Sequence, residues 1–361
     1  MLYLDYQATT PLAPEVKTAM LPWLAAPGEG DGFANPASAY RAGRAASVMV
    51  EQARDAVAAL LPRGGQVVFT SGATEALNWA MARAKGPKAA LAIEHAATRA
   101  SMELVGGTDL PVGADGVAPP PDPALLPEAG LVAVMLVNNE VGTIQPVADY
   151  ADAAHARGSL LLCDAVQALG RVPIPNNVDL VALSAHKVHG PKGIGALWIR
   201  DGVELAPLIV GGSQEHGLRA GTVSPALIAG FGAAATLCAE RWDTDHAHVS
   251  RLWEIAAERI AGWQILGSTT HRYRGNLSLR KDGVNGSRLL SDAREVAFSL
   301  GSACASGSGK ASHVLRAMGF SPEEARGAIR IGWGRYTSEA ELHAGIDALL
   351  AAATVQERFA A

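Results

Sequence analysis

Leu180-Val181-Ala182-Leu183-Ser184-Ala185-His186-Lys187 decides the fold: four apolar residues run together and end abruptly in small and polar ones. An apolar run of this length without alternation is typical of a strand buried on both faces of a parallel sheet. The same pattern recurs at Gln66–Thr70, Ala89–Ile93, Leu131–Val137 and Ser159–Cys163. We therefore expect these runs to be neighbouring strands of one α/β domain.

Helical patterns separate the strands, as a parallel sheet requires. Glu75–Ala84 and Val147–Ala156 have the composition of covering helices, so helices should lie on both faces of the sheet. The rhythm changes after a charged amphipathic stretch, Asp245–Ala261, beyond which a strand is expected at Gly275–Arg280 and a helix at Gly286–Arg294. We expect a large domain over residues 13–250 and a smaller α+β domain made of residues 1–12 and 251–361.

Two helix starts near the C-terminus are marked by capping boxes. Ser321 precedes Glu324, and Ser338 precedes Glu341, each by three residues. In this arrangement the serine and the glutamate each satisfy a backbone N–H of the first turn.

Composition limits the possible functions. The chain has 361 residues, a net charge of −5 and dispersed charges, which gives no electrostatic basis for binding nucleic acid or an anionic membrane. No export signal or apolar run of membrane-spanning length is present. Three widely spaced cysteines form neither a disulfide framework nor a CxxC motif, which favours a reducing cytoplasm. We expect a cytoplasmic enzyme with a small-molecule substrate.

Polar residues at the strand ends are the first candidates for a site, because ligands of open α/β sheets bind there. Ser71-Gly72-Ala73-Thr74-Glu75 follows one strand and opens a helix, so its backbone N–H groups could hold an anion. Alone, such a turn is more often only a turn. Asp164 and Gln167 follow a second strand, and Asp164 could simply be a helix cap. Lys187 follows a third and could be a solvated charge.

Together these strand ends supply an anion site, a carboxylate and an amine. Those are the parts that bind pyridoxal phosphate, which needs a phosphate site, a partner for its pyridine nitrogen and a lysine for the Schiff base. The residues after two further strands also suit such a site. Asn138–Gly142 offers side chains for the ring oxygen or a substrate, and His95 could lie over a ring or move protons. A lone histidine is more often structural, so His95 gains weight only from its position.

Cys304 differs from the other cysteines. Cys163 lies in an apolar strand and Cys238 in an Ala/Leu-rich helical pattern, so both should be unreactive core thiols. Cys304 lies in the Gly/Ser-rich stretch 301–310, whose composition predicts exposure and mobility. In isolation it could equally be an incidental cysteine in a linker.

These motifs, in their order and spacing, resemble those of the class V aminotransferase superfamily of fold-type I pyridoxal-phosphate enzymes, and within it the NifS/IscS-like cysteine desulfurases. The resemblance extends over nearly the whole chain. It includes Tyr3–Pro11, Asn35–Ser38, Phe69–Glu75, Glu94–His95, Asn138–Gly142, Asp164–Gln167, Ser184–Gly193, Arg219–Thr222, Gly301–Ser306 and Arg330–Gly332.

The resemblance implies a fold-type I architecture, with a mostly parallel seven-stranded sheet covered by helices and a smaller C-terminal domain carrying a mobile Cys304 loop. It also implies the site. Lys187 would attach pyridoxal 5'-phosphate, Asp164 would pair with the pyridine nitrogen, Gln167 would bond the ring oxygen, and His95 would stack on the ring and assist proton transfer. The phosphate would be held by Ala73, Thr74, Ser184, His186 and, from the other subunit of a homodimer, Thr222. Asn139 would contact cofactor and substrate, and Arg330 would receive the substrate carboxylate with Asn35 and Asn139.

The implied reaction converts L-cysteine to L-alanine and leaves the sulfur on Cys304 as a persulfide, which an acceptor or scaffold protein would take for iron–sulfur cluster or other sulfur-cofactor assembly. Within enzymes, selenocysteine lyase or another class V reaction would use the same residues without Cys304. A non-catalytic sulfur-transfer scaffold is the alternative outside enzymes, although it would not need Lys187, Asp164 and His95. A zinc site at His186 and His189 is less favoured, because no further ligands cluster nearby. Ala185 and Ser299-Leu300-Gly301 depart from the common family pattern, and the short segment after Arg335 leaves the acceptor open.

Overall fold

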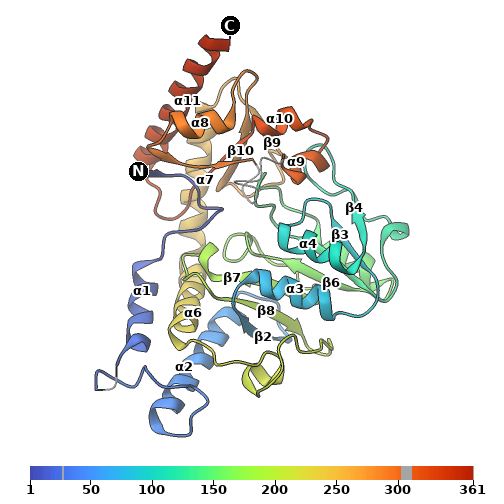
Figure 1. The fold of residues 1–361 in the computed structure, drawn as a ribbon, viewed down its shortest axis with the longest axis vertical. Helices are drawn as coiled ribbons and strands as arrows, with labels where there is room; N and C mark the ends of the chain where they lie inside the picture. The colour runs from blue at the N-terminus through green and yellow to red at the C-terminus, as the bar shows by residue number, and fades with distance from the viewer. Residues whose placement is uncertain (27, 302–310, 361) are drawn as a thin grey trace.

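The computed structural model describes residues 1–26, 28–301 and 311–360. Its largest element is a seven-stranded sheet with the order β2-β8-β7-β6-β5-β3-β4, and Figure 1 shows it in the lower part of the molecule. The strands are β2 (Gly65–Thr70), β3 (Lys88–Leu91), β4 (Thr108–Leu110), β5 (Leu131–Met135), β6 (Leu160–Asp164), β7 (Leu180–Ser184) and β8 (Gly195–Arg200). The expected seven-stranded, mostly parallel sheet is thus confirmed.

Only β8 runs against its neighbours. It pairs antiparallel with both β2 and β7, whereas β4, β3, β5, β6 and β7 pair parallel. Because β2 and β7 both oppose β8, they point the same way, and their carboxyl ends meet at one edge with those of β5 and β6. Gly195 makes a close approach possible there, since a Cβ on it would lie 2.3 Å from the Leu183 carbonyl and 2.7 Å from the Gly72 carbonyl carbon.

Alternate residues of the strands feed two apolar cores on opposite faces. Val181 and Leu183 face the larger core, and Leu180 and Ala182 face the other. Helices α1 (Pro14–Met20), α2 (Arg41–Ala58), α5 (Val147–His155) and α6 (Pro225–Glu240) contribute to the larger core, and α3 (Ala73–Arg83) and α4 (Ala96–Val105) to the other. The result is the three-layered arrangement that a parallel sheet needs to bury both faces.

A second, antiparallel sheet forms the upper part of the molecule in Figure 1. Its order is β12 (Ser299–Leu300), β13 (Ile329–Gly332), β10 (Asn276–Arg280) and β9 (Gln264–Leu266), and β1 (Leu2–Tyr3) pairs separately with β11 (Val296–Ala297). The helices of this part are α7 (Trp242–Arg259), α8 (Gly286–Asp292), α9 (His313–Ala317), α10 (Pro322–Arg326) and α11 (Glu339–Ala360). Short 3-10 helices are η1 (Leu21–Leu24), η2 (Pro123–Leu125), η3 (Ala185–Lys187) and η4 (Gln214–Gly217).

The N-terminal segment belongs to the core of this upper part. Leu4 is fully buried there beside Leu252 and Ile331, and Asp5 forms a bridge to Gly332. The chain then passes downward to α1, so residues 5–10 cross the space between the two sheets (Figure 1).

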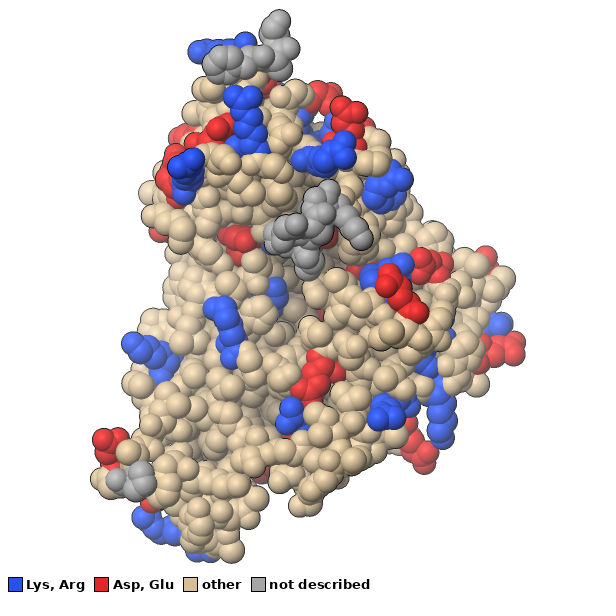
Figure 2. All heavy atoms as spheres, in the orientation of Figure 1, with Lys and Arg blue, Asp and Glu red and all other residues tan. Residues whose placement is uncertain are grey.

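In the described part of the chain, every helix is too short or too polar to cross a bilayer. On the face shown in Figure 2, acidic and basic side chains are interspersed rather than gathered by sign.

Candidate active site

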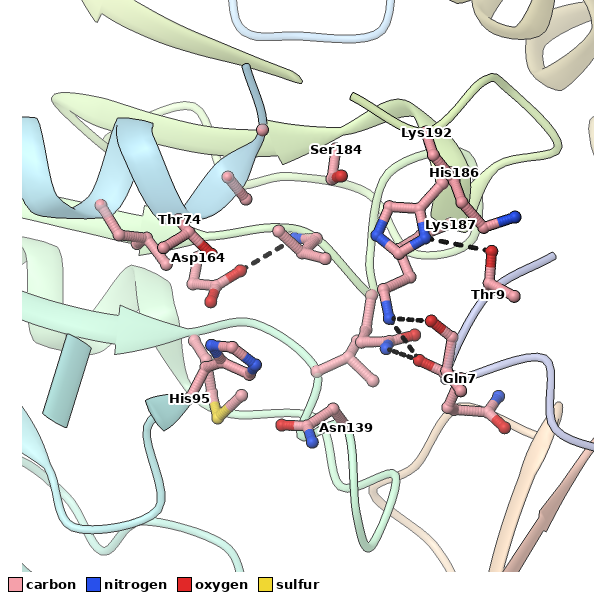
Figure 3. Close-up of a pocket in the computed structure, with 18 of the residues that line it drawn as sticks. Gln7, Thr9, Thr74, His95, Asn139, Asp164, Ser184, His186, Lys187 and Lys192 are labelled. Atoms are coloured by element: carbon pink, nitrogen blue, oxygen red, sulfur yellow. Dashed lines mark hydrogen bonds between the residues drawn. The ribbon is translucent and has the colours of Figure 1, made fainter. Parts of the chain in front are cut away.

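A cavity of about 570 Å³ opens at the carboxyl ends of β2, β5, β6 and β7. Figure 3 shows its labelled side chains converging from these strand ends, from α4 and from the N-terminal segment. Ten of the residues proposed from the sequence line it: Ala73, Thr74, His95, Asn139, Asp164, Gln167, Ser184, His186, Lys187 and Arg330.

One wall of the cavity is the start of α3. Gly72, Ala73 and Thr74 line it, and the first turn of a helix presents backbone N–H groups without intrahelical partners. Glu75 is turned aside, because its carboxylate accepts a hydrogen bond from the Ser71 N–H at 2.8 Å and pairs with Arg219 at 2.8 Å. The N-terminus of α3 therefore remains suited to an anion from outside the chain.

Asp164, the last residue of β6, places a carboxylate at the floor of the cavity. The residue is only 5% exposed, and its Oδ1 accepts the Val166 N–H at 3.0 Å. Burial raises the pKa of Asp164 to about 6, although the charge of Lys187 and the Val166 hydrogen bond oppose the rise. A buried carboxylate of this kind would be stabilised by a cation placed against it.

The amine of Lys187 is held by the N-terminal segment. Its Nζ donates to the carbonyl oxygens of Gln7 and, at 2.9 Å, Ala8 (Figure 3). The Gln7 carbonyl also accepts the Nε2–H of Gln167 at 3.0 Å, and the Gln167 Oε1 accepts a hydrogen bond from Arg171 at 2.9 Å. Arg171 donates in addition to the Lys187 carbonyl, so this arginine fixes both residues from behind the cavity.

His95 caps the start of α4 and is held in one tautomer. Its Nδ1 accepts the Ala97 N–H at 3.1 Å, which leaves the proton of the neutral ring on Nε2. Burial, and then the charge of Lys187, lower the pKa of His95. His186, whose Nδ1 lies 3.1 Å from the Thr9 hydroxyl, has its pKa lowered to about 4, again first by burial. Both rings are therefore neutral near pH 7.

Arg330 of β13 reaches the cavity from the second sheet. Arg330 is only 1% exposed, and its guanidinium donates to the Asn139 carbonyl at 2.9 Å and to the Ser299 hydroxyl at 3.0 Å. It also forms an ion pair with Asp5 at 2.8 Å. The guanidinium is thus fixed in direction, with a carboxylate of the chain itself on one side.

Two of the proposed residues, Asn35 and Thr222, lie outside this cavity. Asn35 is exposed on the segment before α2, where its side chain accepts the Ala37 N–H at 2.9 Å. Thr222 is exposed on the segment before α6. Cys304 falls in residues 302–310, outside the described residues.

Sequence reasoning missed the roles of Asp5, Gln7 and Arg171. None of the three comes directly after a strand of the large sheet, since Arg171 lies seven residues beyond the end of β6, so the strand-end criterion could not find them. In the sequence, Tyr3–Pro11 contributes only to the family resemblance; the contacts of the Gln7 and Ala8 carbonyls with Lys187 depend on the packing of the N-terminal segment between the two sheets.

The other two cysteines are buried as expected. Cys163 in β6 is 0% exposed and Cys238 in α6 is 5% exposed, and burial raises the pKa of both thiols. No group of three potential metal ligands occurs among the residues that the structure describes, so His186 and His189 gain no third partner there.

Comparison with known proteins identifies the family. The class-V aminotransferase family model matches residues 2–344. A cysteine desulfurase of Frankia sp. is 39% identical over 99% of this chain and 92% of its own, and the cysteine desulfurase IscS of Rickettsia bellii is 38% identical over 94% and 88%.

Solved structures agree with these relatives. A NifS-like protein superposes with a TM-score of 0.86 at 31% identity, covering 96% of this chain and 98% of its own. A structure described as SspA in complex with cysteine superposes with a TM-score of 0.78 at 32% identity, covering 94% and 100%. The chain therefore belongs to the class-V aminotransferase family, among its NifS/IscS-like cysteine desulfurases.

Proposed function

We propose that this chain converts L-cysteine to L-alanine in the 570 Å³ cavity, with pyridoxal 5'-phosphate bound there and with Cys304 accepting the sulfur. The observation that carries the proposal is the convergence of the Lys187 amine, the buried Asp164 carboxylate and the N-terminus of α3 on one cavity. Enzymes of this family depend on pyridoxal phosphate in general, and the residues present fit that group.

The fit rests on complementary charges. The N-terminus of α3, with Ala73, Thr74, Ser184 and His186 around it, suits a phosphate, and the raised pKa of Asp164 suits a protonated pyridine nitrogen. Gln167 would bond the ring oxygen, and Asn139 would lie at the ring edge. Lys187 would attach the cofactor, and His95 would stack on it.

When bound, pyridoxal phosphate supplies an electron-accepting ring that makes the Cα proton of an amino acid removable. Lys187 would take that proton at Nζ and return it, since its amine already faces the cavity and is positioned by two carbonyls. Its backbone is fixed by Arg171, which limits the directions in which the amine can move.

His95 would serve as the neutral partner in proton transfer. With its pKa lowered and its Nδ1 engaged by Ala97, it presents an Nε2–H donor and adds no positive charge beside Lys187. That arrangement suits donation to a group that gains negative charge during the reaction.

Arg330, with Asn139 and Asn35, would receive the substrate carboxylate. The Arg330 guanidinium is buried and directed by the Asn139 carbonyl, and a guanidinium binds a carboxylate through two parallel hydrogen bonds. Substrate would have to share Arg330 with Asp5 or displace it.

Cys304, as a thiolate, would attack the substrate sulfur. A sulfur–sulfur bond forms, the carbon–sulfur bond of the substrate breaks, and its carbon is protonated to give alanine, so L-cysteine and one thiol become alanine and one persulfide. We propose that a sulfur-acceptor or scaffold protein then takes the terminal sulfur for iron–sulfur cluster or other sulfur-cofactor assembly.

We also propose that the chain forms a homodimer in which Thr222 contributes to the phosphate site of the other subunit, and that the protein is located in the cytoplasm.

An absorption spectrum before and after L-cysteine, with alanine and sulfide quantified, tests the proposal. We expect a visible cofactor band that changes with L-cysteine, alanine formation by the native chain, and loss of that activity in Cys304→Ala with the band retained. Cys163→Ala, which removes a buried thiol outside the cavity, is the matched control and should stay active. A chain that takes up no pyridoxal phosphate, or alanine formation independent of Cys304, would contradict the proposal.

A further inference from the structure

A second cavity, of about 330 Å³, lies behind the active site between the two sheets. It is lined by the loop after β6, the facing parts of α6 and α7, and the segments at 272–274 and 334–335. Its volume is within the range of sites that bind small ligands, and such sites often lie between domains.

The charges around this cavity do not balance. Among the described residues that line it there are four arginines, Arg171, Arg272, Arg274 and Arg335, and a single acidic residue, Asp245. Asp245 is already engaged, since it pairs with Arg335 at 2.7 Å and with Arg241 at 3.4 Å. The other three arginines have no carboxylate partner within the described part of the chain.

Neutral acceptors take the place of carboxylates at two of these arginines. Arg272 is 6% exposed and donates to the carbonyls of Ser268, Val141 and Asn276. Arg171 donates to Gln167 and to the Lys187 carbonyl, and its guanidinium lies 5.2 Å from the centre of the Tyr273 ring. A buried guanidinium without a counter-charge is costly, and burial accordingly lowers the pKa of Arg272 to about 9.

Besides His189, His246 and Ser250, the remaining wall of the cavity is largely apolar and aromatic. Ile144, Val172, Val188, Val249 and Tyr273 line it beside the arginines. A purely inorganic anion would leave this surface in contact with water, whereas an anion with an apolar body would cover it.

We propose that this second cavity binds a small organic anion, with a carboxylate or phosphate group at the arginines and an apolar body against Val172, Val249 and Tyr273. The anion supplies the negative charge that Arg171, Arg272 and Arg274 do not receive from carboxylates in the described part of the chain. Because Arg171 lines this cavity and also holds Gln167 and Lys187 of the active site, a bound anion draws on the same guanidinium, so occupancy lowers the turnover of L-cysteine.

The test is calorimetric titration of the cofactor-loaded protein with phenyl phosphate, benzoate, inorganic phosphate and phenol at constant ionic strength. Arg274→Gln removes an exposed guanidinium that has no partner in the described part of the chain, and Ser250→Glu places a carboxylate in the cavity as an internal competitor. Arg63→Gln, at an exposed position before β2, makes the same charge change elsewhere and is the matched control.

We expect phenyl phosphate or benzoate to bind, both variants to weaken that binding about tenfold or more, and Arg63→Gln to leave it unchanged. Binding of phenyl phosphate alone assigns a phosphate ligand, and comparable binding of benzoate assigns a carboxylate. Absence of binding, binding insensitive to both variants, equal affinity for inorganic phosphate or phenol, or competition with L-cysteine would each overturn the proposal. An effect on turnover should disappear with binding in both variants.

Discussion

The buried carboxylate of Asp164 destabilises the folded chain, and its hydrogen bond from Val166 and the charge of Lys187 offset this cost only in part. Its folded-state pKa of about 6 exceeds the ordinary value of 3.8 because burial penalises the carboxylate. Above pH 6 the carboxyl is ionised in both folded and unfolded chains, and the folded state bears the cost. As the pH falls from 6 toward 3.8 the folded chain takes up the proton first, so this destabilisation disappears.

Asp164→Asn should therefore stabilise the cofactor-free protein by up to about 3 kcal/mol at pH 8, while weakening its affinity for pyridoxal phosphate. The stabilisation should shrink toward zero between pH 6 and 4. Urea unfolding of both proteins across this range measures it, with Asp201→Asn, at an exposed position after β8, as control. Equal stabilities at every pH would show that the carboxyl is not desolvated as described.

Substitution of Arg330 can distinguish the contribution of its positive charge from that of its forked hydrogen-bond geometry. Arg330→Lys keeps the positive charge and loses the forked pair of donors, so the KM for L-cysteine should rise about tenfold to a hundredfold with a smaller change in kcat. Steady-state alanine formation measures both. Asp5→Asn should have the opposite effect on KM, because it removes the carboxylate that occupies Arg330 at 2.8 Å. A rise in KM in both variants would argue that Asp5 positions Arg330 rather than competing for it.

At the level of single residues, the sequence was most informative where a candidate functional residue comes just after a buried strand. Asp164, Lys187 and His95 were proposed from that criterion, and the structure brings them to one cavity; their chemical roles remain proposals. Arg171 and Gln7 could not be found in this way, because their parts in the site depend on contacts between segments far apart in the chain, such as Lys187 with Gln7.

Among the elements, α10 shows how a local signal translates into structure. The capping box proposed from Ser321 and Glu324 is formed: the Ser321 hydroxyl accepts the Glu324 N–H at 3.2 Å, and Glu324 accepts the Ser321 N–H at 2.8 Å. The second box, at Ser338 and Glu341, is formed in the same way at the start of α11.

Ser321→Ala should cost about 1 kcal/mol, the usual loss for a removed cap, concentrated in α10. Amide hydrogen exchange of α10, with urea unfolding of the whole chain, distinguishes local from global loss. Ser291→Ala, at an exposed position inside α8, removes a hydroxyl away from any N-cap and should be nearly neutral. Unchanged exchange in α10 would mean that tertiary packing alone holds this helix.

Element boundaries were less predictable than element types. The run Leu180–Ser184 coincides with β7, but Leu131–Val137 overshoots β5, which ends at Met135. Leu136 and Val137 are buried too, at 3% and 2% exposure, yet they lie beyond the paired strand. Hydrophobicity reports burial, and burial continues where strand pairing stops. The short strands β9, β12 and β13 leave too few residues for any pattern.

For the whole molecule, we propose that residues 1–12 and 251–361 form one domain and residues 13–250 the other. The packing of Leu4 with Ile331 in the second core supports the first assignment. The proposed boundary between residues 250 and 251 falls inside α7 (Trp242–Arg259), and Val249, on the large-domain side of it, still packs with Leu252 in that second core.

The proposed homodimer can be tested by complementation between two inactive chains. Exposed apolar side chains, including Leu24 at 66%, Val48 at 57% and Val210 at 79%, offer surface for a second copy. Lys187→Ala and Thr222→Asp should each be inactive, the latter because its carboxylate would repel the phosphate. If Thr222 serves the other subunit's site, mixed dimers hold one intact site, and about a quarter of the native activity should return after unfolding and refolding them together.

Mixing without refolding is the control, since it leaves the original dimers in place. Light scattering should give the mass of two chains for both variants. A monomer, or no recovery from verified mixed dimers, would contradict the shared site.

The burial of Cys163 and Cys238 also makes the native chain a selective target for covalent labelling. Both thiols are nearly inaccessible and have raised pKa values, so a maleimide dye should not react with them while the fold is intact. Of three cysteines in the sequence, only Cys304 would then be modified rapidly, and all three would react once the chain is unfolded. Mass spectrometry of the labelled protein would count the dyes. A fluorophore could thus be placed on the residue proposed to carry sulfur, without replacing any other cysteine, to report on that residue's surroundings when pyridoxal phosphate or L-cysteine is added.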